Sequence, residues 1–312
     1  MPCEHQACNH QTLDSWLHAA ALTALFTLSA CAAPQEHFAK MSAPGGTLRV
    51  RYLTEGKGST AIVLIHGWTC SAAFWRQQST DFAPSYRVIS IDLPGHGKSD
   101  KPKNIDYTIP LFAQAVEAVM HDAHATRAII AGHSMGVPVA MQAIVDHPER
   151  FIGFVAVDGA VWRPASPSGE RKPTQQQQQH PQSTFGQRLR ADYVGTATPN
   201  IEAMFAPGTP ADLREEIRER MLATPSYVAA SASENIGQSD VWTHMPSTLP
   251  TLIVVAGRQK DDDRRAIYQE YFPNSQFELW EEAGHFLMME QPARFNQLVL
   301  DFANRIAAAA AR

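Results

Sequence analysis

The sequence predicts an α/β fold, in which a mostly parallel central sheet is flanked by helices and carries an inserted helical cap. From residue 46 onward, strand-like runs alternate with runs of helical period, which is typical of a parallel sheet covered by helices. The runs 61–65 and 128–131 are continuously apolar, as expected of strands buried on both faces. Glycines stand two places on either side of Ser134, between the second run and an apolar stretch of helical length, which indicates a tight turn from strand to helix.

Each strand of the predicted sheet is a short run that is either apolar or alternating in polarity. The strands are expected over 47–53, 61–65, 87–91, 127–131, 151–157, 251–256 and 276–280. Apolar residues recur close to a helical period in 111–122, which predicts a helix there. Further helices are expected over 71–79, 137–145, 263–271 and 284–306.

The predicted core is split by a long insertion. Residues 46–160 and 247–312 are assigned to the core, and residues 161–246 form the predicted cap. Within the cap, helices are expected over 201–204 and 212–222. The segment 164–186 is rich in Pro, Ser and Gln, and this composition predicts a disordered surface segment.

Composition limits the class of protein. The chain of 312 residues is 44% hydrophobic and 18% charged, which fits a globular protein with a sizeable core. Its formal net charge of −5 offers no basic field to a polyanion. Nucleic acid is therefore excluded as a partner.

Residues 1–31 are expected to be a leader. The apolar run 19–30 is too short to span a bilayer but has the length of a signal-peptide core. Its end, Leu28-Ser29-Ala30-Cys31, resembles the lipobox of bacterial lipoproteins, whose cysteine is acylated and becomes the mature N-terminus. Residues 1–18 depart from such signals because they hold no Lys or Arg. The resemblance implies a lipid anchor at Cys31 and a place in the bacterial cell envelope, facing the periplasm or the exterior; an unprocessed leader would leave the protein secreted or cytoplasmic.

Ser134 is the candidate nucleophile. The flanking glycines allow the strand and the helix to approach closely, so the Ser134 hydroxyl stands clear at a helix N-terminus, where backbone N–H dipoles favour negative charge. A serine hydroxyl needs a base within hydrogen-bond reach, and the base needs an orienting acid. His285 is the candidate base, because it follows the last predicted strand in a turn beside Gly284.

A tetrahedral intermediate also needs hydrogen-bond donors for its oxyanion. The backbone N–H groups of Met135, directly after Ser134, and of Trp68, in the loop after the strand 61–65, are placed for this role. The simpler alternative is that Gly67 only permits a turn.

Four motifs make the chain resemble the α/β-hydrolase superfamily over about residues 46–306. They are His66-Gly67-Trp68, the segment 92–99, the segment 132–136 and Gly284-His285-Phe286. The resemblance implies the α/β-hydrolase fold, with nucleophile, acid and histidine in that chain order.

The position of the acid departs from the family pattern. In the family it usually lies three residues beyond the glycine that ends the next-to-last strand, which from Gly257 would be Lys260. The resemblance therefore favours Asp261 or Asp262, shifted by a loop insertion. It leaves open Asp158, at the end of the strand 151–157, where some relatives place the acid.

We expect a serine hydrolase that cleaves a small-molecule carboxylic ester or lactone through an acyl-serine intermediate, without cofactor or metal. His121 and His124, three apart on a predicted helix, lack a third metal ligand, and Cys70 is expected to be a buried apolar residue. Three alternatives remain: a carbon–carbon hydrolase or a metal-free perhydrolase on the same fold, or a binding protein that has lost turnover. Cap residues are candidates for the substrate pocket or for ordinary cap core: Trp162, Phe185, Met204, Phe205 and Trp242.

Overall fold

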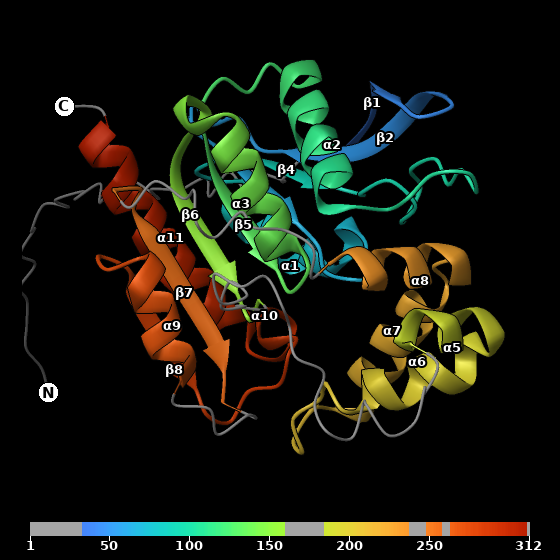
Figure 1. The fold of residues 1–312 in the computed structure, drawn as a ribbon. Helices are drawn as coiled ribbons and strands as arrows, with labels where there is room; N and C mark the ends of the chain where they lie inside the picture. The colour runs from blue at the N-terminus through green and yellow to red at the C-terminus, as the bar shows by residue number, and fades with distance from the viewer. Residues whose placement is uncertain (1–32, 160–183, 237–247, 258–262, 311–312) are drawn as a thin grey trace, which may run out of the picture. The chain divides into compact units, whose positions relative to one another are not determined.

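The structure, a computed structural model, describes residues 33–159, 184–236, 248–257 and 263–310. Its centre is an eight-stranded sheet with the order β1-β2-β4-β3-β5-β6-β7-β8 (Figure 1). The strands are β1 (Gln35–Ala43), β2 (Gly46–Glu55), β3 (Ala61–Ile65), β4 (Arg87–Ile91), β5 (Ala128–His133), β6 (Phe151–Val157), β7 (Thr251–Ala256) and β8 (Gln276–Trp280). The predicted fold class is confirmed, and five of the seven predicted strands have the predicted bounds.

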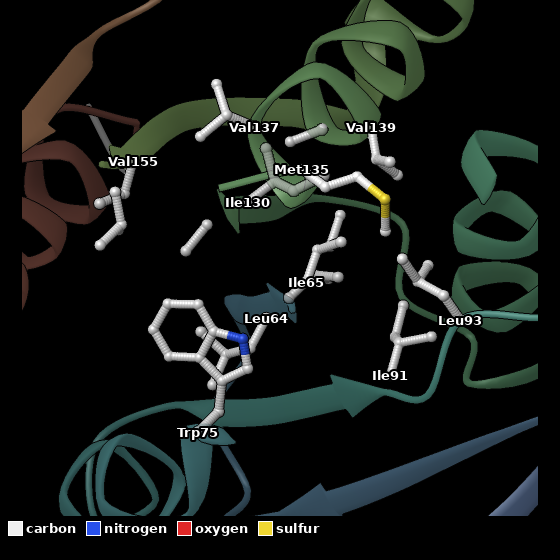
Figure 2. Close-up of a cluster of buried hydrophobic side chains, with 14 of the residues drawn as sticks. Leu64, Ile65, Trp75, Ile91, Leu93, Ile130, Met135, Val137, Val139 and Val155 are labelled. Carbon is white, nitrogen blue, oxygen red and sulfur yellow. The ribbon is translucent and has the colours of Figure 1, made fainter. Parts of the chain in front are cut away.

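The parallel part of the sheet runs from β4 to β8, while β1 and β2 join it antiparallel. Every residue of β3, β5 and β7 is buried, as continuous apolar runs with helices on both faces require. Figure 2 shows part of this core, with Leu64 and Ile65 of β3 and Ile130 of β5 close to Met135 and Val137. The core thus packs directly against the segment that carries Ser134.

Strand β1 lies before residue 46, where the sequence analysis places the start of the core. It pairs with β2 along its whole length at the edge of the sheet. Only Ala39 and Met41 of β1 are buried, and its first residues are polar. An edge strand with one short apolar face gives a weak pattern, which explains why it is absent from the prediction.

Helices cover the sheet in two layers. Helices α2 and α3 pack against each other, as do α1 and α11 (Figure 1). The predicted final helix is broken in two, because Pro292 begins α11 and proline fits the first turn of a helix. The core helices are the 3₁₀ helix η1 (Ala72–Trp75), α1 (Arg76–Phe82), α2 (Ile109–Asp122), α3 (Gly136–Asp146), the 3₁₀ helix η2 (Pro148–Arg150), α9 (Asp263–Tyr271), α10 (Leu287–Glu290) and α11 (Pro292–Ala310).

The cap contributes four described helices between β6 and β7. They are α5 (Phe185–Ala191), α6 (Tyr193–Glu202), α7 (Ala211–Leu222) and α8 (Ser226–Asn235). The predicted disordered segment 164–186 lies outside the described residues up to 183, but its last two residues begin α5, and Thr184 caps that helix. In the described part, 184–186, a capping box at Thr184 favours the helix that begins there. Among the described helices, none has the length and apolar character needed to cross a membrane.

Candidate active site

Ser134 stands in a sharp turn between β5 and α3. Its φ is +55°, in the left-handed region that is uncommon for residues other than glycine. A Cβ at Gly132 would lie 2.2 Å from the carbonyl oxygen of Gly136, so the chain can close this turn only with glycine there. The Ser134 N–H donates to the Val157 carbonyl at 2.9 Å, which fixes the turn to the end of β6.

His285 and Asp158 form a buried pair beside this turn. The Nδ1 atom of His285 lies 2.6 Å from Oδ2 of Asp158, and the other carboxylate oxygen accepts the Ala256 N–H at 3.0 Å. His285 is 7% exposed and Asp158 6%. A carboxylate only accepts, so Nδ1 of His285 carries a proton, and in the tautomer that this contact favours Nε2 keeps its lone pair for the proton of a hydroxyl.

His133 connects the serine turn to the His285 loop. Its Nε2 lies 2.8 Å from the His285 carbonyl oxygen, and the centroids of the two rings are 4.6 Å apart. Burial, reinforced by the neighbouring His285, lowers the pKa of His133 to about 3. His133 is therefore neutral and donates from Nε2. The sequence analysis assigns it no role, although its place inside the Gly-x-Ser-x-Gly motif was the available signal.

The loop after β3 packs against Ser134 from the other side. A Cβ at Gly67 would lie 3.0 Å from the Cβ of Ser134, so only glycine allows this approach without a shift. Among the residues that the structure describes, neither the Trp68 N–H nor the Met135 N–H donates a hydrogen bond. The oxyanion of a tetrahedral intermediate formed on Ser134 requires unused donors of this kind.

Cap residues contact the His285 loop. The His285 N–H donates to the Met204 carbonyl at 2.8 Å. Phe205, a candidate for the pocket, is 8% exposed, and its ring centroid lies 5.9 Å from that of Phe286. Phe205 therefore packs beside the loop of the candidate base. Within that loop, the Gly284 N–H donates to Oε2 of Glu290 at 2.6 Å.

Other candidates of the sequence analysis are placed as follows. Five lie outside the described residues: Cys31, Trp162, Trp242, Asp261 and Asp262. Cys70 is buried, and burial raises the pKa of its thiol. His121 and His124 are expected on one helix, but His124 lies beyond the end of α2 with φ +51°, so the two do not share a helix face. In the described part of the chain, no group of three or more His, Cys, Asp or Glu residues is arranged to hold a metal ion.

Comparison with known proteins shows the family of the chain. The model of the alpha/beta hydrolase family matches residues 62–298, and the chain belongs to this family. The 2-hydroxy-6-oxononadienedioate/2-hydroxy-6-oxononatrienedioate hydrolase of Paraburkholderia phymatum is 28% identical over 282 residues, 83% of this chain and 92% of that protein. The pimeloyl-[acyl-carrier protein] methyl ester esterase of Aeromonas hydrophila is 26% identical over 252 residues, 77% of this chain and 94% of that protein.

A solved structure gives the same fold. A thermophilic esterase from Thermogutta terrifontis aligns with a TM-score of 0.74 at 23% identity, covering 87% of this chain and 99% of that one. The names of these relatives, a hydrolase and an esterase, support hydrolysis by this chain and do not identify the bond that it cleaves.

Proposed function

We propose that the protein is a serine hydrolase that cleaves a carboxylic ester or lactone through an acyl-serine intermediate. The observation that carries the proposal is the 2.6 Å contact between His285 and Asp158, beside a serine held at φ +55°. Asp158 takes the role of the acid in this proposal, ahead of Asp261 and Asp262, because its carboxylate fixes the tautomer that a base for Ser134 needs.

In the proposed reaction, Oγ of Ser134 attacks the carbonyl carbon while Nε2 of His285 takes the hydroxyl proton. The carbonyl oxygen becomes an oxyanion that accepts from the Trp68 and Met135 N–H groups. When the carbon–oxygen bond breaks, His285 returns its proton to the leaving alkoxide, which in a lactone stays attached to the acyl group. Water, deprotonated by His285, then attacks the acyl-serine, and as the bond between the acyl carbon and Oγ of Ser134 breaks, His285 returns the proton to Oγ and the acid is released.

The described part of the cap, residues 184–236, favours a neutral ester over a dianionic substrate. All five arginines of the described cap are already engaged: Arg190 with Glu234, Arg218 with Glu202, Arg220 with Glu216, Arg214 with backbone carbonyls, and Arg188 over the ring of Phe185. Recruiting one of them to bind a carboxylate would exchange an existing, partly exposed contact for a new one, so the net gain in binding free energy would be small. The esterase of Aeromonas hydrophila, named for a methyl ester, supports the same choice.

A second candidate is carbon–carbon bond hydrolysis. It is favoured by the relative from Paraburkholderia phymatum, which is similar over most of both chains and is named for a dioate substrate. The same serine and histidine would serve both reactions. A dioate carries two carboxylates, so this alternative requires cations beyond those that the described cap leaves open.

The test is hydrolysis of p-nitrophenyl esters from acetate to dodecanoate by the wild type, Ser134→Ala and His285→Ala. We expect ester cleavage by the wild type and a loss of at least about 10³-fold in kcat in both variants. Loss in both variants, with folding unchanged by circular dichroism, would support the acyl-serine route. A wild type that cleaves no ester of the series but cleaves a 6-oxo-dienoate would replace the proposal with the second candidate.

We also propose that the leader is removed before Cys31 and that Cys31 carries a lipid anchor in the bacterial envelope. In support, the described fold begins after this residue, with β1 at Gln35, so processing would leave every described element intact. Intact mass after expression in a bacterial host should lack residues 1–30 and include added lipid. A product that retains Met1 would refute this proposal.

A further inference from the structure

The loop that carries Trp68 has a conformation that needs support from outside. Thr69 has φ +56°, which is strained for a β-branched residue and costs on the order of 1–3 kcal/mol. A bond from the Cys70 N–H to the Gly67 carbonyl at 3.2 Å closes the turn. Strain of this kind persists only where the surrounding structure holds it.

The core holds the two ends of this loop. Nε2 of His66 accepts the Leu93 N–H at 3.0 Å, and the Ala72 N–H donates to the buried carboxylate of Asp92 at 2.7 Å. Neither bond reaches Trp68 or Thr69, in the middle of the loop.

The cap holds the middle of the loop. The indole N–H of Trp68 donates to the Ala229 carbonyl in α8 at 2.8 Å, and the hydroxyl of Thr224, between α7 and α8, donates to the Thr69 carbonyl at 3.0 Å. Trp68, Thr69 and Thr224 are all buried. The ring of Trp68 also lies 5.8 Å from the ring of Phe185 in α5. The loop also holds itself, through the Cys70 N–H and through the Cys70 thiol, which donates to the Trp68 carbonyl at 3.4 Å, and its remaining support at Trp68 and Thr69 comes from cap groups.

We propose that the Trp68 indole and Thr224 are positioning groups through which the docked cap aims the Trp68 backbone N–H at the oxyanion. This inference rests on the proposed function, in which that N–H stabilises the tetrahedral intermediate. Because an oxyanion donor acts most strongly in the transition state, its misplacement lowers kcat more than it raises KM. A substrate that keeps the cap from docking would then react slowly even when it binds.

The chain offers a matched control. The hydroxyl of Tyr227, also in α8, donates to the Lys101 carbonyl at 2.7 Å, so Tyr227→Phe removes one bond between the cap and the core without touching the 67–70 loop. Trp68→Phe keeps an aromatic ring and the backbone N–H but removes the indole donor. Thr224→Val keeps the shape of the side chain but removes the hydroxyl.

The experiment measures kcat and KM on p-nitrophenyl butyrate and the inhibition constant of phenylboronic acid, which forms a tetrahedral adduct with serine. In Trp68→Phe and Thr224→Val we expect kcat to fall about 10- to 100-fold with KM within about twofold of wild type. The inhibition constant should rise in parallel, since the adduct resembles the transition state. Tyr227→Phe should retain wild-type values.

Several outcomes would overturn the inference. These are an unchanged kcat in both loop variants, an equal loss in Tyr227→Phe, or a lower kcat with an unchanged inhibition constant, which indicates fewer active molecules. If the wild type hydrolyses no ester, the proposed function fails, and the rate at which a fluorophosphonate labels Ser134 tests the inference instead, because its phosphoryl oxygen needs the same donors. Equal labelling rates in the wild type and both loop variants would then refute it.

Discussion

The two loops that flank Ser134 are held by different parts of the molecule. The ring and carbonyl of His285 are held by Asp158 and His133, at the ends of β6 and β5, and the cap reaches this residue through its backbone N–H. The middle of the Trp68 loop is held by α8 and Thr224 of the cap. The orientation of the candidate base is thus set by the sheet, and that of a candidate oxyanion donor by the cap.

The largest loss of kcat should come from a substitution among the residues of the sheet that hold His285. Asp158→Asn removes the charge beside His285 and allows the wrong tautomer, so kcat on an ester should fall about 10²- to 10⁴-fold. Asp261→Asn and Asp262→Asn are the matched controls and should lie within about threefold of wild type if Asp158 is the residue that orients His285. A larger loss in either control would move the acid to the loop after β7 and undo the comparison.

A smaller loss of kcat is expected from substitutions of His133. In His133→Phe the carbonyl of His285 loses its donor, so the loop shifts and kcat should fall about tenfold. His133→Gln retains an N–H donor and should recover most of this loss. Steady-state kinetics with active-site titration separates a shifted loop from misfolding. Equal losses of kcat in both variants would show that the hydrogen bond from His133 to the His285 carbonyl does not account for the loss.

Acid should destabilise the core through its buried histidines, since the pKa values of His66, His96 and His133 are all lowered. Burial, with the nearby His66 adding to it, lowers the pKa of His96 to about 3, as burial does for His133. The unfolded chain takes up these protons near pH 6.5 and the folded chain near pH 3. The free energy of unfolding should therefore fall as the pH drops through this window, by up to about 1.4 kcal/mol per pH unit for each histidine.

Urea unfolding at pH 7, 6 and 5 measures this slope. His96→Asn removes one titrating ring but keeps a donor for the Pro94 carbonyl, which accepts from Nδ1 at 2.9 Å. The free energy of unfolding of this variant should fall less steeply with falling pH than that of the wild type, by the equivalent of about one bound proton. Parallel curves for the two proteins would contradict the lowered pKa of His96.

The smallest effect is expected at a cap contact that does not involve the Trp68 loop. Arg76 in α1 and Glu216 in α7 are paired at 2.9 Å, and both side chains are partly exposed. Such pairs contribute little, so Glu216→Gln should leave kcat unchanged and lower Tm by less than about 2 °C. A drop in kcat comparable to that of Trp68→Phe would mean that any loosening of the cap slows the reaction.

The elements read most accurately from the sequence are those whose pattern is local. The strands 61–65 and 251–256 are continuously apolar and have the predicted bounds. Helix α8 is built largely from alanine and serine, which give little amphipathic pattern, and it was not predicted.

The contacts within the site join residues far apart in sequence. Asp158 and His285 are 127 positions apart, and Trp68 and Ala229 are 161 positions apart. The local sequence favours Asp261 or Asp262 for the acid and leaves Asp158 open, and the register of β5, β6 and β7 brings Asp158 to His285. Nothing local to Trp68 indicates that its indole is held by the cap.

The close packing of glycines around Ser134 affects how a saturation mutagenesis library of this protein would be read. A side chain at Gly132 would meet the Gly136 carbonyl at 2.2 Å, and one at Gly67 would press on Ser134 at 3.0 Å. Selection for activity alone would deplete variants at these glycines as strongly as variants of the serine, although glycine has no functional group. A parallel selection for folded protein would separate them, because replacing the Ser134 hydroxyl by alanine leaves the packing of the turn intact while a new Cβ at Gly132 does not.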